Sequence, residues 1–211
     1  IAVTYDKLNH RLSFSMDKNW RRKFVKILSF RKYETIVDVA SGTGDLLVNL
    51  QKLNATKYIA VDPSPNMLEI AKTKVADAQF IVSGAESMPL ADQYADLITV
   101  SFGIRNFVSP DEALKEFYRV LKLGGITSIM EFSVPRFFLF RWGFKLYIFT
   151  VIPIWGKILS GDKKAYKYLA QSIVNFAQTT DITQKLKSAG FTAVKTHNLM
   201  LGSVRIYEGR K

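Results

Sequence analysis

The feature of this sequence that most constrains its fold is the stretch TIVDVASGTGDL, residues 35–46. Residues 35–40 form an apolar run that predicts a buried parallel strand. Gly42 and Gly44 would let the chain turn tightly against a ligand, and the helix that follows would present its free N-terminal amides there. A second apolar run, YIAVD, ends at Asp62. This layout is typical of a loop that holds a nucleotide-like cofactor.

Two details distinguish between cofactors. A dinucleotide site carries the pattern G-x-G-x-x-G, but Leu47 stands at its third glycine, which disfavours NAD. Asp38 lies four residues before the first glycine, and Asp62 closes the next strand, where a carboxylate can accept both ribose hydroxyls. This pattern resembles the S-adenosylmethionine (SAM) site of class I methyltransferases. The alternatives are that Asp38 caps a helix or turn and that Asp62 forms an Asx turn into Pro63.

The length of 211 residues suits one well-buried α/β domain, and no linker or repeat divides the chain. We therefore expect a single domain over 1–211, with an N-terminal helical region at 1–32 and an apolar helical insertion at 134–162. The absence of cysteine excludes disulfides and cysteine nucleophiles. We expect no secretory signal at the start, although the sequence leaves open what precedes Ile1. We also expect no metal site, because no His/Asp/Glu cluster stands at ligand spacing.

The net charge of +12 is distributed unevenly. Residues 1–32 carry nine Lys and Arg against two acids, residues 33–100 carry four against nine, and residues 101–211 carry seventeen against seven. Basic flanks can attract nucleic acid or anionic lipid, or they can simply be solvated. Charge alone does not decide between these alternatives.

The hydrophobic pattern alternates between strand and helix periods, which predicts a doubly wound, mostly parallel α/β sheet of Rossmann type. Strands are expected at 35–40, 57–62, 79–83, 96–102 and 126–132, and a terminal antiparallel pair at 191–198 and 202–208. Helices are expected within 11–30 and at 45–53, 66–76, 110–121, 163–177 and 181–189. Ser109 is the predicted N-cap of the helix at 110–121, and Gly124 with Gly125 is expected to end it.

The most apolar segment, residues 137–159, contains eight aromatic residues. Its longest uncharged run, 146–156, has eleven residues and includes Pro153, whereas about 20 are needed to span a bilayer. We therefore expect it not to cross the membrane. Arg141 and Lys145 share one helical face, which fits an interfacial helix or a lid over a long apolar ligand, with a core helix as the alternative.

The segment 98–133, ITVSFGIRNFVSPDEALKEFYRVLKLGGITSIMEFS, closely resembles the ubiquinone/menaquinone biosynthesis C-methyltransferases. That family carries an FGxRN loop and an RVLKPGG…EFS run. Further matches lie at 5–14, at the SGTGD turn, at 84–90 and at 166–173, so the similarity covers essentially the whole chain. The resemblance implies a class I methyltransferase fold with a seven-stranded sheet. It also implies SAM-dependent C-methylation of a reduced prenylated quinone, either demethylmenaquinol or 2-methoxy-6-polyprenyl-1,4-benzoquinol.

The resemblance also assigns residues to the cofactor. Besides the acids and glycines of the first loop, it places Thr43 in the turn, Gly84 and Ala85 beside the adenine, and Ser101 at the end of the fourth strand. The sequence departs from the family at several points. Gly84 replaces an Asn or Asp and leaves only backbone for the base, and Leu123 replaces a proline. The run IYEG near the end replaces LHRG.

The acceptor carbon of a quinol becomes nucleophilic when the neighbouring phenol loses its proton, so a cation is needed there. The resemblance points to Arg105 as the group that stabilises the phenolate and to Asn106 as the group that orients its oxygen. The alternative for Arg105 is an internal pair with a buried acid such as Glu131. Tyr5 is a candidate substrate contact. No general base is evident.

A prenylated substrate resides in the membrane, so we expect a cytoplasmic enzyme that associates peripherally with an anionic membrane surface. A nucleic-acid methyltransferase is a weaker alternative, because SFGI at 101–104 replaces the D/N-P-P-Y/F tetrapeptide. Another lipid-like acceptor and a SAM-binding scaffold stay open. The sequence also leaves open whether the head group is a benzoquinol or a naphthoquinol and whether the chain forms a homodimer.

Overall fold

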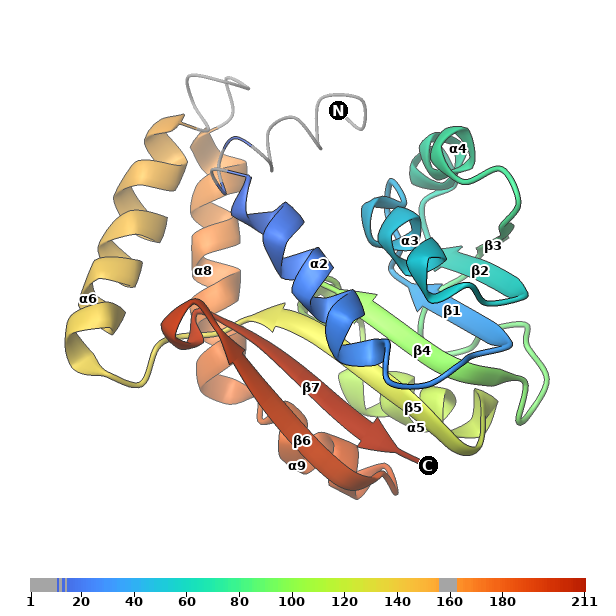
Figure 1. Ribbon diagram of the computed structural model, residues 1–211. Coiled ribbons are helices and arrows are strands. Elements are labelled where there is room, and N and C mark those ends of the chain that lie inside the picture. Colours follow the sequence, from blue (N-terminus) through green and yellow to red (C-terminus); the bar gives the residue numbers. More distant parts are fainter. Residues whose placement is uncertain (1–10, 12, 14, 156–162) are drawn as a thin grey trace.

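The computed structural model describes residues 11, 13, 15–155 and 163–211. Its centre is a seven-stranded sheet in the order β3-β2-β1-β4-β5-β7-β6 (Figure 1). The first five strands pair in parallel, and β7 pairs antiparallel with both β5 and β6. The strands are β1 Thr35–Val39, β2 Lys57–Asp62, β3 Gln79–Val82, β4 Ala95–Ser101, β5 Leu121–Phe132, β6 Thr192–Leu199 and β7 Val204–Arg210. The predicted doubly wound, mostly parallel sheet is confirmed.

Helices cover both faces of the sheet because neighbouring strand residues point to opposite sides. Ile36 packs with Trp20 and Phe24 of the first described helix, whereas Val37 packs with Phe117 on the other face. All five residues of β1 are buried, as expected for the middle of a doubly wound sheet. The helices are α2 Met16–Leu28, α3 Asp45–Leu50, α4 Pro65–Lys74, α5 Pro110–Val120, α6 Phe138–Leu146, α8 Lys163–Thr179 and α9 Ile182–Ser188, with short turns η1 Gln51–Leu53, η2 Ile104–Asn106, η3 Tyr147–Val151 and η4 Met200–Gly202.

Helix α5 begins where the sequence predicts and ends earlier than it predicts. The Ser109 hydroxyl accepts a hydrogen bond from the backbone N–H of Glu112 at 3.3 Å, which confirms the predicted N-cap. The predicted end at the two glycines is wrong, because α5 stops at Val120 and β5 starts at once. The chain before β4 takes the last helical carbonyls: Tyr94 N–H donates to Val120 O at 2.7 Å. The glycines therefore lie inside β5.

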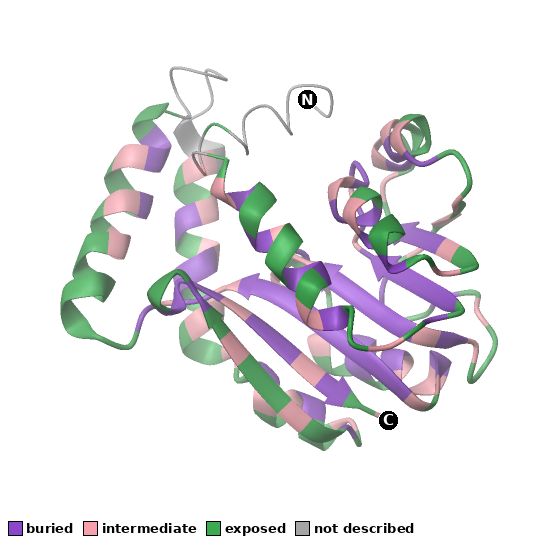
Figure 2. Cartoon of the chain, viewed as in Figure 1, coloured by how far each residue is buried: buried purple, intermediate pink, exposed green. Residues whose placement is uncertain are grey.

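The insertion forms a separate layer beside the sheet, in which α6 and η3 pack against α8 (Figure 1). The contact is made by Ile148 and Ile152 on one side and by Ala170 and Val174 of α8 on the other. Helix α6 buries none of its nine residues, which excludes the core-helix alternative for this stretch (Figure 2).

The helix that begins at Phe138 is longer than the eleven-residue uncharged run at 146–156. Within the part of the chain that the structure describes, Phe138–Trp155 is helical over 18 residues, has a mean hydropathy of 1.2 and is only 11% buried. Eighteen residues extend about 27 Å, so length and composition alone would allow this helix to cross a membrane. The helix continues through Pro153, so it is longer than the eleven-residue uncharged run on which the expectation of no crossing is based.

Candidate active site

A cavity of about 400 Å³ lies at the carboxyl ends of the parallel strands, beside the point where the sheet order reverses between β1 and β4. Open α/β sheets bind their ligands at this position. The loops that follow β1, β2, β3 and β4 form the walls, and α2 contributes Arg21. The lining residues are Arg21, Asp38, Val39, Ala40, Ser41, Gly42, Thr43, Asp45, Leu46, Asp62, Pro63, Ser64, Met67, Ser83, Gly84, Ala85, Glu86, Ser101, Phe102, Gly103, Asn106, Phe107 and Val108.

The predicted cofactor residues meet at this cavity, with one exception. Asp38, Gly42, Thr43, Asp62, Gly84, Ala85 and Ser101 all belong to the lining. Gly44 does not; it begins α3 with φ of 80° and lies against α4. A Cβ at this position would be 3.0 Å from the Cβ of Ala71, so Gly44 allows the close packing of two helices. None of the described residues of the insertion, 134–155, lines the cavity.

Asp62 connects the loop after β1 to the loop after β2. Its Oδ2 accepts the Gly42 N–H at 2.8 Å, and its Oδ1 accepts the Ser64 N–H at 2.9 Å, which is the Asx turn considered as the alternative. The side chain is nevertheless at the cavity wall. A carboxylate offers about four acceptor positions, so the two backbone bonds leave capacity for ligand hydroxyls. The turn and the ligand contact are therefore compatible.

Asp38 is buried beneath the cavity. Its Oδ1 accepts a hydrogen bond from Thr99 Oγ1 at 2.7 Å, while Oδ2 has no partner among the described residues. Burial raises the pKa of Asp38 to about 7, against the opposing effects of the Thr99 hydrogen bond and the positive charge of Arg21. A buried carboxylate oxygen without a partner indicates a missing donor or cation.

The hydroxyls of Ser41 and Ser101 are buried in the same wall and have no hydrogen-bond partner in the part of the chain that the structure describes. With Asp38 Oδ2 they form three unpaired polar atoms around one cavity. SAM carries an ammonium group, a carboxylate and a ribose diol, which together need acceptors and donors of these kinds. The residues present therefore fit this cofactor.

The loop after β4 forms another part of the wall. Phe102 adopts a φ of 58°, and Gly103 packs directly on the loop after β1. A Cβ at Gly103 would lie 2.6 Å from the Cβ of Ala40, a distance that requires one of the two backbones to move. Gly103 is thus a contact point between the two loops that form the cavity.

Arg105 lies outside the lining of the cavity. Its guanidinium is 2.8 Å from Glu131 Oε1, donates to Phe102 O at 2.6 Å and lies over the Phe132 ring. The geometry supports the alternative interpretation, an internal ion pair, and gives Arg105 no contact with the cavity. Asn106, the other predicted catalytic residue of this loop, does line the cavity. Tyr5 lies outside the described residues.

Sequence reasoning missed three charged residues of the lining, Arg21, Asp45 and Glu86. Arg21 reaches the cavity from α2, where it pairs with Asp17 and lies 3.5 Å from Asp45. The position of Arg21 on α2 does not distinguish it from the other basic residues of this helix. Glu86 accepts the Ser109 N–H at 3.2 Å and thereby connects the loop after β3 to α5. The contacts of Arg21 with Asp45 and of Glu86 with Ser109 are non-local, and no spacing rule indicates them.

The sheet order, the glycine loop between β1 and α3 and the acids below the cavity define a class I SAM-dependent methyltransferase. The relationship with known proteins is more specific than this class. The chain belongs to the ubiE/COQ5 methyltransferase family, whose model matches residues 1–211. The resemblance found in the sequence is therefore confirmed, and the cofactor is SAM.

Individual relatives agree with this assignment. The chain is 39% identical to the ubiquinone/menaquinone biosynthesis C-methyltransferase of Geotalea daltonii, with 100% of this chain and 93% of that protein covered. It is 38% identical to the demethylmenaquinone methyltransferase of Bacteroides fragilis, with 100% and 89% covered. Among solved structures, a SAM-dependent methyltransferase from Thermotoga maritima has a TM-score of 0.70 at 24% identity, with 100% and 96% covered. This last similarity supports the fold alone.

Proposed function

We propose that this methyltransferase transfers the methyl group of SAM to a ring carbon of a reduced prenylated quinone. The observation that carries the proposal is the family match over the whole chain, together with relatives of 38–39% identity named for menaquinone and ubiquinone biosynthesis. The demethylmenaquinone methyltransferase of B. fragilis favours a naphthoquinol head group. A benzoquinol is the second candidate, because the G. daltonii relative is named for both pathways.

Bound SAM would supply an electrophilic methyl group attached to a sulfonium. Once the methyl group has been transferred, the rest of the cofactor is a neutral thioether, so its departure needs no acid. The protein therefore has to hold, orient and shield the reactants. Asp62 would hold the ribose, Asp38 would face a cationic group, and Ser41 and Ser101 would donate to or accept from the polar groups of the cofactor. Each of these roles follows from an unpaired or partly used polar atom in the cavity wall.

The acceptor must react as its phenolate, whose charge needs a hydrogen-bond donor. We assign this role to Asn106, which lines the cavity, is exposed and follows the internally paired Arg105. The Arg105–Glu131 pair would then act indirectly, by fixing the loop on which Asn106 lies. In this arrangement Asn106 would bind and orient the phenolate oxygen. No residue is assigned as the base that deprotonates the phenol.

Incubation with methyl-labelled SAM tests the proposal. One reaction contains reduced demethylmenaquinone, a second contains the demethylated methoxy-prenylbenzoquinol, and a third contains the oxidised quinone. Mass spectrometry should find a carbon-bound labelled methyl in a quinol reaction and none with the oxidised control. If neither quinol gains the label while SAM binds, another lipid-like acceptor replaces this proposal.

We further propose that the protein binds peripherally to anionic membranes through the α6 layer. Its aromatic residues are exposed to an unusual extent: Phe138 is 70% exposed and Trp142 is 65% exposed (Figure 2). Arg141 and Lys145 on the same helix, together with the net charge of +12, would attract anionic head groups.

An interfacial position suits this helix better than a spanning one. Its second half packs along α8 through Ile148 and Ile152, so the two helices would have to enter the bilayer together. Helix α8 carries Lys167, Gln171 and Asn175, polar residues that are costly inside hydrocarbon. A helix that lies in the interface keeps its aromatic side in lipid and α8 in water.

Co-sedimentation with vesicles tests the membrane proposal. The protein should sediment with phosphatidylglycerol-containing vesicles at low salt, and less with phosphatidylcholine alone. The double change Phe138→Glu and Trp142→Glu should abolish binding. Phe30→Glu is the matched control, because Phe30 is also 67% exposed but follows α2 and lies outside the α6 layer. Equal loss in both variants, or no binding to either vesicle, would contradict the proposal.

A further inference from the structure

The loop after β3 forms one wall of the cofactor cavity and has no helix or strand of its own. Its residues Ser83, Gly84, Ala85 and Glu86 line the cavity. The Ser83 hydroxyl lies 3.1 Å from Gly84 O and 2.9 Å from Ser87 O, so the loop is folded back on itself. Because Gly84 has no side chain, this part of the wall can contact a ligand only through backbone atoms. The position of the backbone therefore decides how well a flat base fits.

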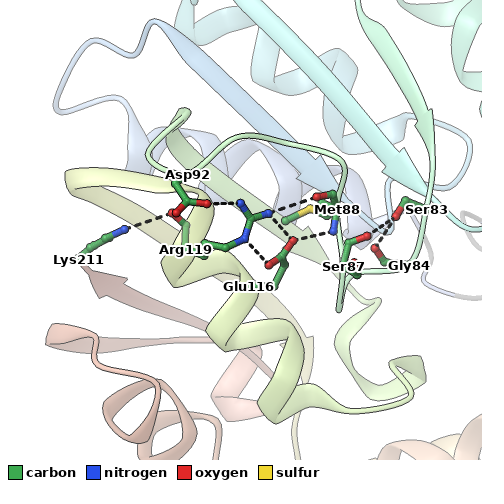
Figure 3. Close-up of polar contacts among 8 residues, drawn as sticks. All are labelled: Ser83, Gly84, Ser87, Met88, Asp92, Glu116, Arg119 and Lys211. Carbon is green, nitrogen blue, oxygen red and sulfur yellow. Dashed lines mark hydrogen bonds and ion pairs between the residues drawn. The ribbon is translucent and has the colours of Figure 1, made fainter.

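A partly buried carboxylate of α5 holds the far end of this loop. Glu116 Oε1 accepts the backbone N–H of Met88 at 2.7 Å, and the Glu116 side chain is only 10% exposed (Figure 3). Met88 itself is 3% exposed and packs in the core between the sheet and α5. The loop is thus connected to a helix that does not itself contact the cavity.

Arg119 fixes the orientation of Glu116. Its Nε and Nη2 each lie 2.7 Å from one oxygen of the Glu116 carboxylate, which is a bidentate pair (Figure 3). The same Nη2 donates to Met88 O at 3.2 Å, and Nη1 pairs with Asp92. One guanidinium therefore contacts both the carboxylate and the loop that the carboxylate holds. A freely rotating Glu116 would not define the loop in this way.

We propose that Glu116, oriented by Arg119, is a positioning residue that sets the affinity and the base selectivity of the enzyme for its adenosyl cofactor through the loop at 83–88. The inference rests on the placement of SAM in this cavity, with its adenine beside Gly84 and Ala85. Glu116 touches neither the cofactor nor the reacting atoms. Its removal should loosen the adenine subsite and leave the geometry around Asn106 unchanged.

Calorimetry with S-adenosylhomocysteine and its deaminated analogue S-inosylhomocysteine tests the inference. Glu116→Ala should weaken binding of the adenosyl compound about tenfold, because one hydrogen bond to a charged group contributes about this much. The variant should also have a smaller preference for adenine over hypoxanthine. Glu116→Gln keeps an acceptor for Met88 N–H and should restore most of the affinity and selectivity. In turnover assays, KM for SAM should rise while kcat at saturating SAM stays within about twofold.

The chain offers a matched control on the same helix. Glu112 pairs with Lys115 at 2.9 Å, and their side chains are 58% and 63% exposed, so Glu112→Gln should change neither affinity nor selectivity. Unchanged selectivity in Glu116→Ala, despite a lower melting temperature, would overturn the inference in favour of a purely structural role. The calorimetric experiment needs no quinol, so it decides this point even if the proposed acceptor is wrong.

Discussion

The guanidinium of Arg105 and the carboxylate of Glu131 form an ion pair of 2.8 Å in which the side chains are 8% and 0% exposed. Glu131 comes from β5, and Arg105 comes from the loop after β4. The carboxylate also accepts the Arg105 N–H at 3.4 Å and the Phe132 N–H at 2.8 Å. The pair therefore joins the cavity loop to the neighbouring strand by both side-chain and backbone contacts.

Removal of one partner should destabilise the fold strongly. Arg105→Met leaves the Glu131 carboxylate buried without compensation, which should lower the free energy of unfolding by about 3–5 kcal/mol. The double variant Arg105→Met and Glu131→Leu should recover much of this loss, because it removes both charges. Urea unfolding of the two variants measures the difference. A single variant that keeps full stability and SAM affinity but loses turnover would instead restore the catalytic interpretation of Arg105.

SAM affinity should depend on pH through Asp38. With the pKa of Asp38 raised to about 7, the carboxyl is largely protonated at pH 6 in the free enzyme. A cationic ligand favours the ionised form, so affinity should rise with pH up to about 7 and then level off. Calorimetry at pH 6 in buffers of different ionisation enthalpy should detect proton release on binding. Affinity that is constant from pH 6 to pH 8 would contradict this role.

The raised pKa of Asp38 also determines how the stability of the free protein changes with pH. Because burial raises the pKa of Asp38 in the folded state, the folded protein binds more protons than the unfolded chain between about pH 4 and pH 7. Stability contributed by this group is therefore present at low pH and is lost as the pH rises through about 7. Asp38→Asn should remove this pH dependence in thermal unfolding.

Asp62 should contribute to both affinity and stability. Asp62→Ala leaves the N–H groups of Gly42 and Ser64 without their acceptors, which should cost about 1–3 kcal/mol of stability as well as SAM binding. Asp62→Asn retains one oxygen acceptor and should fall between the wild type and Ala in thermal unfolding. Full SAM affinity in the Ala variant would exclude Asp62 as a ribose ligand.

Two glycine substitutions should act in opposite directions. Gly103→Ala places a Cβ 2.6 Å from the Cβ of Ala40 and should separate the two loops, lowering both stability and SAM affinity. Gly143→Ala meets nothing within 4 Å on the exposed α6 helix and should raise stability by about 0.5–1 kcal/mol. Thermal unfolding and calorimetry on both proteins compare the effects directly. Unchanged SAM affinity in Gly103→Ala would show that the cavity tolerates a shift of this loop.

Asn106 should affect turnover more than cofactor binding. Asn106→Ala removes the amide that we assign to the phenolate oxygen, so kcat should fall at least about tenfold with little change in SAM affinity. Asn49→Ala is a control at a structural amide, since its side chain donates to Asp45 O within α3. Similar turnover in the Asn106 variant and the wild type would remove this assignment.

Local patterns predicted the elements and the cofactor loop well. The strands of the parallel sheet follow apolar runs. Asp38 and Asp62 near the ends of β1 and β2 line the cavity, as does Gly42 of the loop after β1. The errors arise where non-local contacts prevail. Gly124 and Gly125 suggest a helix end, but strand pairing of Leu121 with Ala95 ends α5 first. Likewise, the sequence offered the pair of Arg105 with Glu131 only as the alternative to a catalytic role, and the structure forms this pair with the acid 26 residues later.

The position of β7 has a consequence for how the molecule is assembled. Because β7 lies between β5 and β6, strand β6 does not pair with any parallel strand. It joins the sheet only through β7, which follows it in the chain. A growing chain could pair β1, β2, β3, β4 and β5 as each emerges, whereas β6 must wait. The last two strands would then dock as a preformed hairpin, and the edge of β5 would remain open for pairing until they arrive.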